Sequence, residues 1–367
     1  MTDPRRILIS GYYGLRNTGD EAVLSAIIKG LRAQSDDIEI IVLSQSPEET
    51  AVTHGVRALP RMSPSQAIND CDLFISGGGS LLQDATSFKS LVYYLLVIGL
   101  AKRRRRKVMV LGQGIGPLRR GISRALTART LSGLDLITVR DAQSAELLRE
   151  LGIQDRIEVT ADPTFILDPC PAEDSGRLLR EAGLGEDEDI IAISLRKWPE
   201  TPGLESAVAK ALSALAEKVA AKFLLVTMQT PDDEALSRQV TRAIGKPDRF
   251  AVQPALWSAN QLLGVLSRCR FVIGMRLHAL IFAAAAGTPS LGIVYDPKVE
   301  QFVRMTGQES ISLSEVASGL LTDLAVQALE KREDLASRLA QTVPPLRDAA
   351  MRNFALVAEL LDESGSG

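Results

Sequence analysis

Residues 271–287 read FVIGMRLHALIFAAAAG, and they contain the structural unit from which the rest of the chain is built. The apolar run Phe271–Ile273 turns at Gly274 into an alanine-rich run, which predicts a strand followed by a helix. Arg276 and His278 lie where that helix begins. A helix N-terminus attracts anions, a guanidinium binds phosphate or carboxylate through paired hydrogen bonds, and an imidazole exchanges a proton near neutral pH. The stretch therefore predicts a site for an anionic substrate and for proton transfer.

The same alternation of short apolar runs and helical runs continues along all 367 residues. Such alternation predicts parallel sheets made of βαβ units, and this length predicts two domains. The expected strands are 7–9, 38–43, 73–75, 108–111, 136–139, 157–160, 190–195, 222–227, 271–273 and 290–294. The expected helices are 21–34, 87–102, 123–132, 142–151, 203–221, 232–244, 259–267, 277–286, 315–332 and 335–342. We therefore expect an α/β protein with two Rossmann-like domains that face a central cleft.

Prolines mark the expected boundaries of these domains. Asp168–Asp174 contains two prolines and a change of charge, so it is the predicted linker. Pro344 and Pro345 are expected to break the chain before a last helix, which could cross back onto the first domain. The expected parts are an N-terminal Rossmann-like domain at 1–170, a C-terminal one at 171–345, the last helix at 346–362 and a linker-like tail at 363–367.

Composition and charge exclude several classes of protein. The chain is 46% apolar and 24% charged, as globular α/β proteins are, and its net charge of −3 does not favour nucleic acid as a partner. Cys71, Cys170 and Cys269 are isolated from one another and from histidine, so neither a metal site nor a disulfide framework is predicted. The first residues lack the apolar core of a signal peptide. We expect a cytoplasmic enzyme that uses no metal and no cofactor.

Three expected strands run into glycine-rich segments. GYYGLRNTGDE (11–21), SGGGSLLQD (76–84) and GQGIGPL (112–118) follow strands at points where glycine allows the backbone to come close to a ligand. Together they predict the floor of a pocket. A tight turn, or helix capping by Thr18 or Asp20, would explain each segment on its own. The first segment lacks G-x-G-x-x-G spacing, so it does not predict dinucleotide binding.

Three basic residues lie just after the ends of three further expected strands. They are Arg140 in TVRDAQS, Arg196 in SLRKW and Lys298 in YDPK. For each of them, a solvated or ion-paired surface position is the alternative to a role in binding. His54, in VTHGV, has no charged neighbour in sequence and is predicted to take no part in a site.

A family resemblance becomes visible when these segments are taken in order. GYYGLRNTGDEAVL, SGGGSLLQD, GQGIGPL, TVRDAQS, ADPTF, SLRKW and GMRLHALIFAAAAGTP resemble the polysaccharide pyruvyl transferases, and among them the bacterial CsaB type, which pyruvylates cell-wall glycopolymers. The resemblance runs from residue 7 to about residue 305. It implies the fold of the two-domain GT-B glycosyltransferases. It also implies transfer of pyruvate from phosphoenolpyruvate to two hydroxyls of one sugar, commonly N-acetylmannosamine in a lipid-linked saccharide, which forms a cyclic ketal and releases phosphate.

The resemblance implies roles for particular residues as well. Arg140, Arg276 and His278 belong to the phosphoenolpyruvate site of such enzymes. Ketal formation requires protonation of C3 of phosphoenolpyruvate and removal of the hydroxyl protons, so we expect His278 to be the acid and Asp20 the base. The other residues expected at the donor are Leu277, Arg196 and Lys298. Those expected at the acceptor are Asn17, Thr18, Gly77, Gly78, Gly79, Gln83, Asp84 and Gln113.

Residues 91–107 concern the question whether the protein binds its acceptor at a membrane surface. The apolar run LVYYLLVIGLA is shorter than the ~20 residues of a membrane span, and six basic residues follow it directly. The pairing predicts peripheral contact with the inner face of an anionic membrane, which would suit a lipid-linked acceptor. A buried helix that ends in solvated basic residues is the alternative.

Two other functions stay open at this point. A GT-B-type glycosyltransferase or sugar-nucleotide epimerase would bind a nucleoside diphosphate sugar and not phosphoenolpyruvate. A non-catalytic sugar- or phosphate-binding protein would release no phosphate. The presence of Arg140, Arg276 and His278 together favours an enzyme. Neither the acceptor sugar nor the oligomeric state is predicted.

Overall fold

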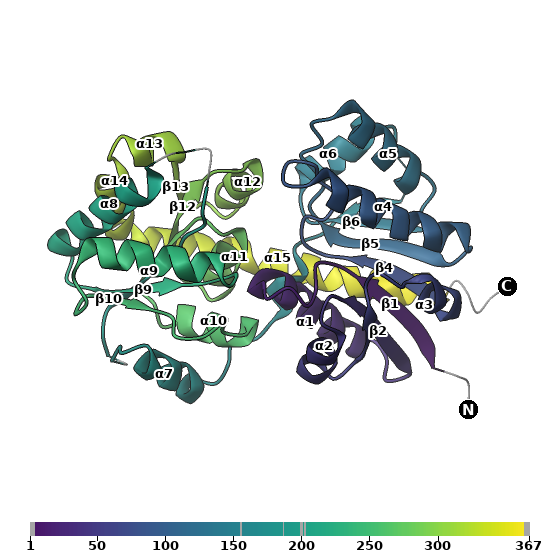
Figure 1. The fold of residues 1–367 in the computed structure, drawn as a ribbon, viewed down its shortest axis with the longest axis horizontal. Coiled ribbons are helices and arrows are strands. Elements are labelled where there is room, and N and C mark those ends of the chain that lie inside the picture. Colours follow the sequence, from purple (N-terminus) through teal and green to yellow (C-terminus); the bar gives the residue numbers. More distant parts are fainter. Residues whose placement is uncertain (1–3, 155, 186, 199–200, 202, 363–367) are drawn as a thin grey trace. The chain divides into compact units, whose positions relative to one another are not determined.

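Two parallel β-sheets organise the chain, and each belongs to a separate unit of the computed structural model (Figure 1). The structure describes residues 4–154, 156–185, 187–198, 201 and 203–362. The first unit consists of residues 1–166 with 346–367, and the second of residues 167–345. The boundary thus lies slightly before the expected one, and the C-terminal segment belongs to the first unit. The expected tail, 363–367, lies outside the described residues.

The first unit is built on a seven-stranded parallel sheet. In spatial order its strands are β3 (Arg57–Pro60), β2 (Ile38–Ser44), β1 (Arg5–Ser10), β4 (Leu73–Gly77), β5 (Lys107–Gln113), β6 (Leu136–Val139) and β7 (Ile157–Val159). In the register of the central strands, Ile9 of β1 lies between Val42 of β2 and Ile75 of β4. The inner residues of these strands, such as 7–9 of β1 and 40–43 of β2, are apolar and buried because helices cover both faces of the sheet.

Helices cover the two faces of this sheet according to the direction in which the chain moves across it. Right-handed crossovers place α1 (Thr18–Arg32) and α2 (Pro47–His54) on one face. They place α3 (Ser65–Asp70), α4 (Phe88–Arg103), α5 (Gly121–Leu131) and α6 (Ala142–Glu150) on the other, where these four helices share one apolar core with the sheet. The short 3-10 helix η1 (Pro163–Ile166) packs on α1, where Lys29 Nζ donates to the Ile166 carbonyl at 2.8 Å.

The second unit repeats the arrangement with six parallel strands. Their spatial order is β10 (Phe250–Val252), β9 (Lys222–Val226), β8 (Ile190–Ser194), β11 (Phe271–Gly274), β12 (Ser290–Val294) and β13 (Glu309–Ser312). One face is covered by α8 (Leu204–Lys218), α9 (Asp232–Ile244), α13 (Leu313–Ala317) and α14 (Leu321–Glu330), which share a core with the sheet. The unit also contains α7 (Ala172–Glu181), α10 (Ala259–Leu266), α11 (Leu277–Ala285), α12 (Pro297–Met305) and the first part of α15 (Arg332–Asp362).

Several elements differ from the sequence expectation. The short strands β3, β10 and β13 and the helices α2, α3, α7 and α12 were not expected, because each is brief or interrupts a polar stretch. Helix α7 begins at Ala172, so the expected linker 168–174 is partly helical. The expected helix 315–332 is two helices, because Gly319 adopts a φ of 91° between α13 and α14.

The prediction that Pro344 and Pro345 break the chain is wrong. Helix α15 (Arg332–Asp362) runs through both prolines. Each proline removes a backbone donor and crowds the carbonyl four residues earlier. Here those carbonyls belong to Ala340 and Gln341, which are exposed and can bond to water. Buried residues on both sides of the prolines, including Leu335 and Phe354, hold the helix in place.

The apolar segment 91–101 belongs to the core of the first unit. Leu91, Tyr94, Ile98 and Ala101 on α4 are buried, whereas Leu96 is 67% exposed. Most of the apolar side chains therefore do not face a membrane, which favours the alternative of a buried helix with a basic end. Among the described residues, no helix has the length and apolar character needed to cross a bilayer.

Candidate functional site

Each sheet has one point at which its helices change faces. In the first unit it lies between β1 and β4, and in the second between β8 and β11. Ligands of such sheets bind outside the carboxyl ends of the strands at this switch point. The segment at 11–21 follows β1 and the segment at 76–84 includes the end of β4; SLRKW includes the end of β8, and GMRLH the end of β11. The structure thus gathers the predicted residues into two groups, one in each unit.

In the first unit, the loop after β1 is held by Asn17 and Glu21. Asn17 is the N-cap of α1, and its side chain accepts from the backbone N–H groups of Gly19 at 3.0 Å and Asp20 at 3.4 Å. Glu21 Oε1 accepts from the N–H of Gly14 at 2.8 Å. His54 Nε2 lies 3.1 Å from Glu21 Oε2. His54 has no charged neighbour in sequence, but α2 carries it to a carboxylate that is distant in sequence, and its contact with Glu21 supports the loop after β1.

Asp20 and the glycine loop after β4 are in contact. A Cβ placed on Gly79, which has a φ of 73°, would lie only 3.2 Å from Asp20 Oδ1, and one on Gly78 would overlap Val23. Tyr13 is buried beneath both loops and donates to the Gly77 carbonyl at 3.4 Å. Burial, reinforced by the charges of Asp20 and Glu21, raises the pKa of Tyr13 well above its usual value. The phenol of Tyr13 therefore stays neutral. The loops after β1 and β4 can approach one another closely because their glycines have no side chains in the way.

Three of the residues expected at the acceptor have structural partners. Gln113 is fully buried and donates to the Ser76 hydroxyl at 2.8 Å, which ties β5 to β4. Asp84 is buried, and its two oxygens accept from the backbone N–H groups of Arg119 at 2.7 Å and Arg120 at 3.0 Å. Gln83 bonds to Thr86. These contacts make the three residues supports for the loops.

Arg140 lies in the first unit, and its guanidinium is engaged on every side. Nη1 contacts Asp162 Oδ2 at 2.9 Å, Nε lies 3.7 Å from Asp141 Oδ2, and Nη2 donates to the Ser80 hydroxyl at 2.9 Å. The residue is 7% exposed. A Cβ on Gly114 would lie 2.8 Å from Nη2, so the guanidinium rests against a glycine backbone. Asp162 was not singled out from the sequence, although its ADPTF segment was.

In the second unit, Arg276 is held by a carboxylate that sequence reasoning also missed. Asp233, at the start of α9, is fully buried, and its Oδ2 and Oδ1 accept from Arg276 Nε at 2.9 Å and Nη2 at 2.5 Å. The same carboxylate accepts from the backbone N–H groups of Met228 and Gln229. Nη1 of Arg276 makes no hydrogen bond with any residue that the structure describes. The signal available in sequence was PDDE (231–234), an acidic helix start after a strand.

Helix α11 begins directly after Arg276. Arg276 is its N-cap and its side chain makes no capping bond, so the first N–H groups of α11 are not capped by it. His278 is half-buried in the first turn, with its ring centroid 6.2 Å from that of Phe282. The Leu277 side chain is buried, so Leu277 can meet an anion only through its backbone N–H. A guanidinium, a helix N-terminus and an imidazole thus follow one strand.

Arg196 and Lys298 complete this edge of the second sheet. Arg196 Nη1 donates to the Tyr295 hydroxyl at 3.1 Å, and the guanidinium lies 5.7 Å from the Trp198 ring and 5.3 Å from the Tyr295 ring. This cluster joins the loops after β8 and β12, the strands that flank β11. Lys298 is paired with its own N-cap residue, Asp296, at 3.6 Å. Arg196 is therefore the better placed of the two for an anion near β11.

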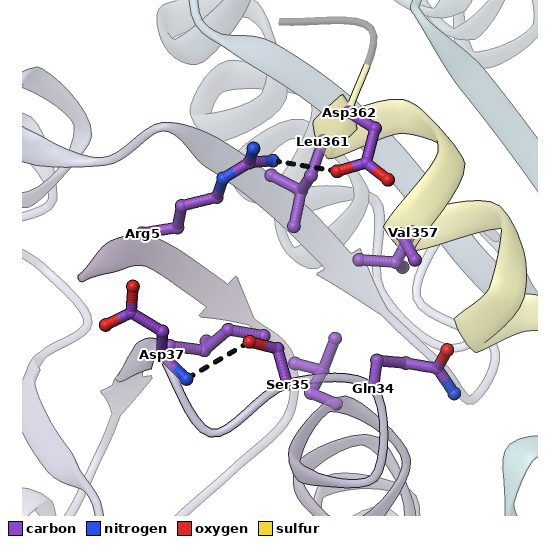
Figure 2. A pocket seen from close by; sticks show the side chains of 10 residues that line it. Arg5, Gln34, Ser35, Asp37, Val357, Leu361 and Asp362 are labelled. Carbon is purple, nitrogen blue, oxygen red and sulfur yellow. Dashed lines mark hydrogen bonds and ion pairs between the residues drawn. The ribbon is translucent and has the colours of Figure 1, made fainter. Parts of the chain in front are cut away.

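The pocket of about 300 Å³ in the first unit is separate from these residues (Figure 2). It is lined by the amino ends of β1 and β2 and by the end of α15, at the edge opposite the glycine loops. Arg5 and Asp362 form an ion pair across it at 3.6 Å. It contains no residue predicted to act in a site.

Cysteine and metal chemistry find little support in the described part of the chain. No group of three or more His, Cys, Asp or Glu residues suited to a metal ion occurs there. Burial raises the pKa of the Cys269 thiol to about 12 and that of Cys71 to about 11, so neither is a thiolate at neutral pH.

A sequence model of the polysaccharide pyruvyl transferase family matches residues 17–297. The chain belongs to this family. AmsJ of Erwinia amylovora, an amylovoran biosynthesis protein, is 20% identical to this pyruvyl transferase over 402 residues, which cover 92% of the chain and 95% of AmsJ. Family membership implies a saccharide acceptor and transfer of a pyruvyl group.

Solved structures share the fold of this pyruvyl transferase. MnaA from S. aureus, solved with UDP, has a TM-score of 0.67 at 13% identity and covers 95% of this chain and 94% of its own. HepE from Anabaena, solved with UDP-glucose, has a TM-score of 0.63 at 13% identity and covers 96% and 99%. Two Rossmann-like domains of GT-B-like form are therefore confirmed as the architecture.

Proposed function

We propose that this pyruvyl transferase takes its pyruvyl group from phosphoenolpyruvate and joins it as a cyclic ketal to two hydroxyls of one sugar. The observation that carries the proposal is the grouping of Arg276, the N-terminus of α11 and His278 at the switch point of the second sheet. Phosphoenolpyruvate has a carboxylate, a phosphate and a carbon that must be protonated. This grouping offers cationic and N–H partners for the anions and an imidazole for the proton.

Several groups bind the donor in this proposal, and the guanidinium of Arg276 is the one that is held in a fixed position. Because Asp233 holds Nε and Nη2 of Arg276, the guanidinium has one orientation, and its Nη1 group is available to an oxygen of the donor. Asp233 also balances the charge of Arg276, so attraction of the donor depends on the uncapped helix end and on Arg196 as well. Leu277 contributes its N–H, and Lys298 is a weaker partner because Asp296 pairs with it.

The reaction begins with transfer of a proton to the donor. His278 gives its proton to C3, which turns the methylene into a methyl group and makes C2 electrophilic. One sugar hydroxyl attacks C2 and loses its proton to a base. The bond between C2 and the phosphate oxygen breaks, and the phosphate leaves with the bonding electron pair. The second hydroxyl then attacks C2 and loses its proton, which closes the ketal ring. Of the two hydroxyl protons, one replaces the proton that His278 gave to C3, and the other leaves on the phosphate. Preorganised cationic groups stabilise the departing phosphate.

The first unit binds the acceptor in this proposal. Asp20 is its base, since the carboxylate lies against Gly79 where the loops after β1 and β4 meet. Backbone groups of Gly77–Gly79 and the polar residues Asn17 and Thr18 form the rest of the acceptor site. Arg140 keeps Ser80 in place for that loop, a task that its three contacts support more directly than binding of the donor.

The acceptor that we propose is N-acetylmannosamine in a lipid-linked saccharide, as in the CsaB type. This follows from the resemblance of the ordered motifs and from the acceptor class that the family implies. AmsJ, the 20% identical relative, is an amylovoran biosynthesis protein, so the acceptor sugar is the part of the proposal to be tested with several saccharides.

Thermal-shift titration distinguishes this donor from a nucleotide sugar. Phosphoenolpyruvate is expected to raise Tm in a concentration-dependent manner, because a ligand that binds only the folded state stabilises it. UDP-sugars are expected to leave Tm unchanged. Release of inorganic phosphate in the presence of an acceptor saccharide then separates an enzyme from a binding protein. A shift with UDP-N-acetylglucosamine and none with phosphoenolpyruvate would overturn the proposal in favour of an epimerase or glycosyltransferase.

Replacement of Asp20 with Asn is expected to lower kcat by about 100-fold at saturating acceptor, because the amide cannot take the hydroxyl proton. Phosphate release measures the change. Asp84→Asn is the matched control, because the Asp84 carboxylate accepts hydrogen bonds from the backbone N–H groups of Arg119 and Arg120. This substitution is expected to change Tm more than kcat. Unchanged turnover of Asp20→Asn would exclude Asp20 as the base.

A further inference from the structure

Charge is distributed very unevenly along the chain. Residues 85–134 contain eleven of the 42 lysines and arginines and none of the 45 acidic residues. The rest of the chain is therefore acidic overall, and a net charge of −3 conceals a strongly basic part. The six consecutive basic residues at 102–107 are only the most conspicuous portion of it. Such segregation creates a positive potential over the surface that these residues form.

The two helices of this segment form one surface of the first unit, and the strand β5 between them is buried in the sheet. The helices, α4 and α5, pack side by side on the same face of the sheet (Figure 1). Lys89, Leu96 and Arg103 are spaced seven residues apart on α4, and Ile122 and Arg129 have the same spacing on α5, so each set lies on one side of its helix. All five side chains are exposed. We refer to these two outward sides, with the loop residues Arg104, Arg105, Arg119 and Arg120, as the α4–α5 face.

The charges of the α4–α5 face are not neutralised within the described chain. The exposed basic side chains of this face that form no ion pair with described residues are Lys89, Arg103, Arg104, Arg105, Arg119, Arg120 and Arg129. Arg124 is paired with Glu150 of α6 at 3.1 Å, at the border of the face. An unpaired cluster of cations gains free energy from an anionic partner, because the mutual repulsion of the cations is relieved there.

Two aliphatic side chains stand among these cations. Leu96 is 67% exposed and Ile122 is 59% exposed, although the other large apolar residues of α4 are buried or half-buried. A water-soluble polyanion has no apolar region in which these two side chains could be buried. A bilayer offers them its acyl region, while its anionic headgroups meet the surrounding arginines and lysines.

We propose that the α4–α5 face docks this protein on an anionic lipid surface. Binding combines attraction between the cations and the headgroups with shallow insertion of Leu96 and Ile122. The mode differs from anchoring by an apolar segment 91–101, whose side chains are mostly in the core. The proposal does not depend on the donor or the acceptor, because none of these residues belongs to the proposed active site.

Vesicle sedimentation with the full chain tests the proposal. The protein is expected to sediment with vesicles of phosphatidylcholine containing phosphatidylglycerol and to stay in the supernatant with phosphatidylcholine alone. Each cation near an anionic bilayer contributes roughly a fivefold gain in binding, so Arg103→Glu with Arg129→Glu is expected to weaken binding by on the order of a hundredfold. Leu96→Ser with Ile122→Ser is expected to leave a weaker binding that disappears at high salt.

The matched control reverses two exposed charges of the second unit, Lys210→Glu with Arg242→Glu, and is expected to bind vesicles as the wild type does. The Tm of every variant establishes that it is folded, and turnover with a soluble acceptor is expected to be unchanged. Equal losses in the control, no loss in the Arg103 and Arg129 variant, or binding to heparin or DNA with none to anionic vesicles would overturn the proposal. Loss of turnover in all variants, with vesicle binding as expected, would count against the proposed function and would leave the docking proposal supported.

Discussion

Replacement of His278 with Gln is expected to lower kcat by about 10²–10⁴-fold, because the amide cannot deliver a proton to C3 of phosphoenolpyruvate. The side chain stays similar in size, and His278 is half-buried at the first turn of a helix whose other residues carry the packing, so Tm should change little. The measurement is phosphate release at saturating donor and acceptor. The KM for phosphoenolpyruvate should rise much less than kcat falls.

The only other histidine provides the matched control. His54 contacts Glu21 and Ser25, all within the first unit, so His54→Gln should disturb the glycine loop without removing the acid. Its effect is expected in the KM of the acceptor. A further measurement is specific to proton donation: in D₂O, the wild type should place one deuteron on the new methyl group of the ketal. Wild-type turnover of His278→Gln would exclude His278 as the acid.

The second large effect concerns the pair of Arg276 and Asp233. Asp233 is fully buried and accepts four hydrogen bonds, two of them from Arg276. Arg276→Ala leaves this carboxylate buried without a cation, a change that costs about 3–5 kcal/mol of unfolding free energy. Chemical denaturation at fixed pH measures it. Since the variant also loses a donor contact, stability and function must be separated by further variants.

Two variants make that separation. Asp233→Asn with Arg276→Gln removes both charges while keeping hydrogen-bonding groups, so most of the lost stability should return although phosphoenolpyruvate binds poorly. Arg276→Lys keeps the charge but cannot bond to Asp233 and to the donor at once, so its KM for the donor should rise by about 10–100-fold. If the double variant bound phosphoenolpyruvate as the wild type does, Arg276 would be a structural residue only.

Much of the fold follows from local patterns of sequence. The inner part of a central strand, such as 40–43 (IIVL) in β2, is an apolar run because it is buried on both faces, and this pattern is readable without a structure. Short edge strands such as β13 (Glu309–Ser312) are mostly polar and only partly buried, so they show no apolar run by which they could be predicted. Pro344 and Pro345 predict a break by local rules, yet packing of the residues on both sides carries α15 through them.

The candidate site divides in the same way. By itself, the sequence determined the groups that one strand-to-helix turn holds together: Arg276, Leu277 and His278 are neighbours along the chain, so their joint position at a helix start needs no tertiary information. Only the tertiary structure decided which partners fix them. The partner of Arg276 is Asp233, that of Arg140 is Asp162, and that of His54 is Glu21. Each of these pairs is at least 22 residues apart in sequence. They meet because the order of strands in the sheet brings segments that are distant in sequence together. In the two pairs of arginine and aspartate, the buried charges are stable there because each faces an opposite charge.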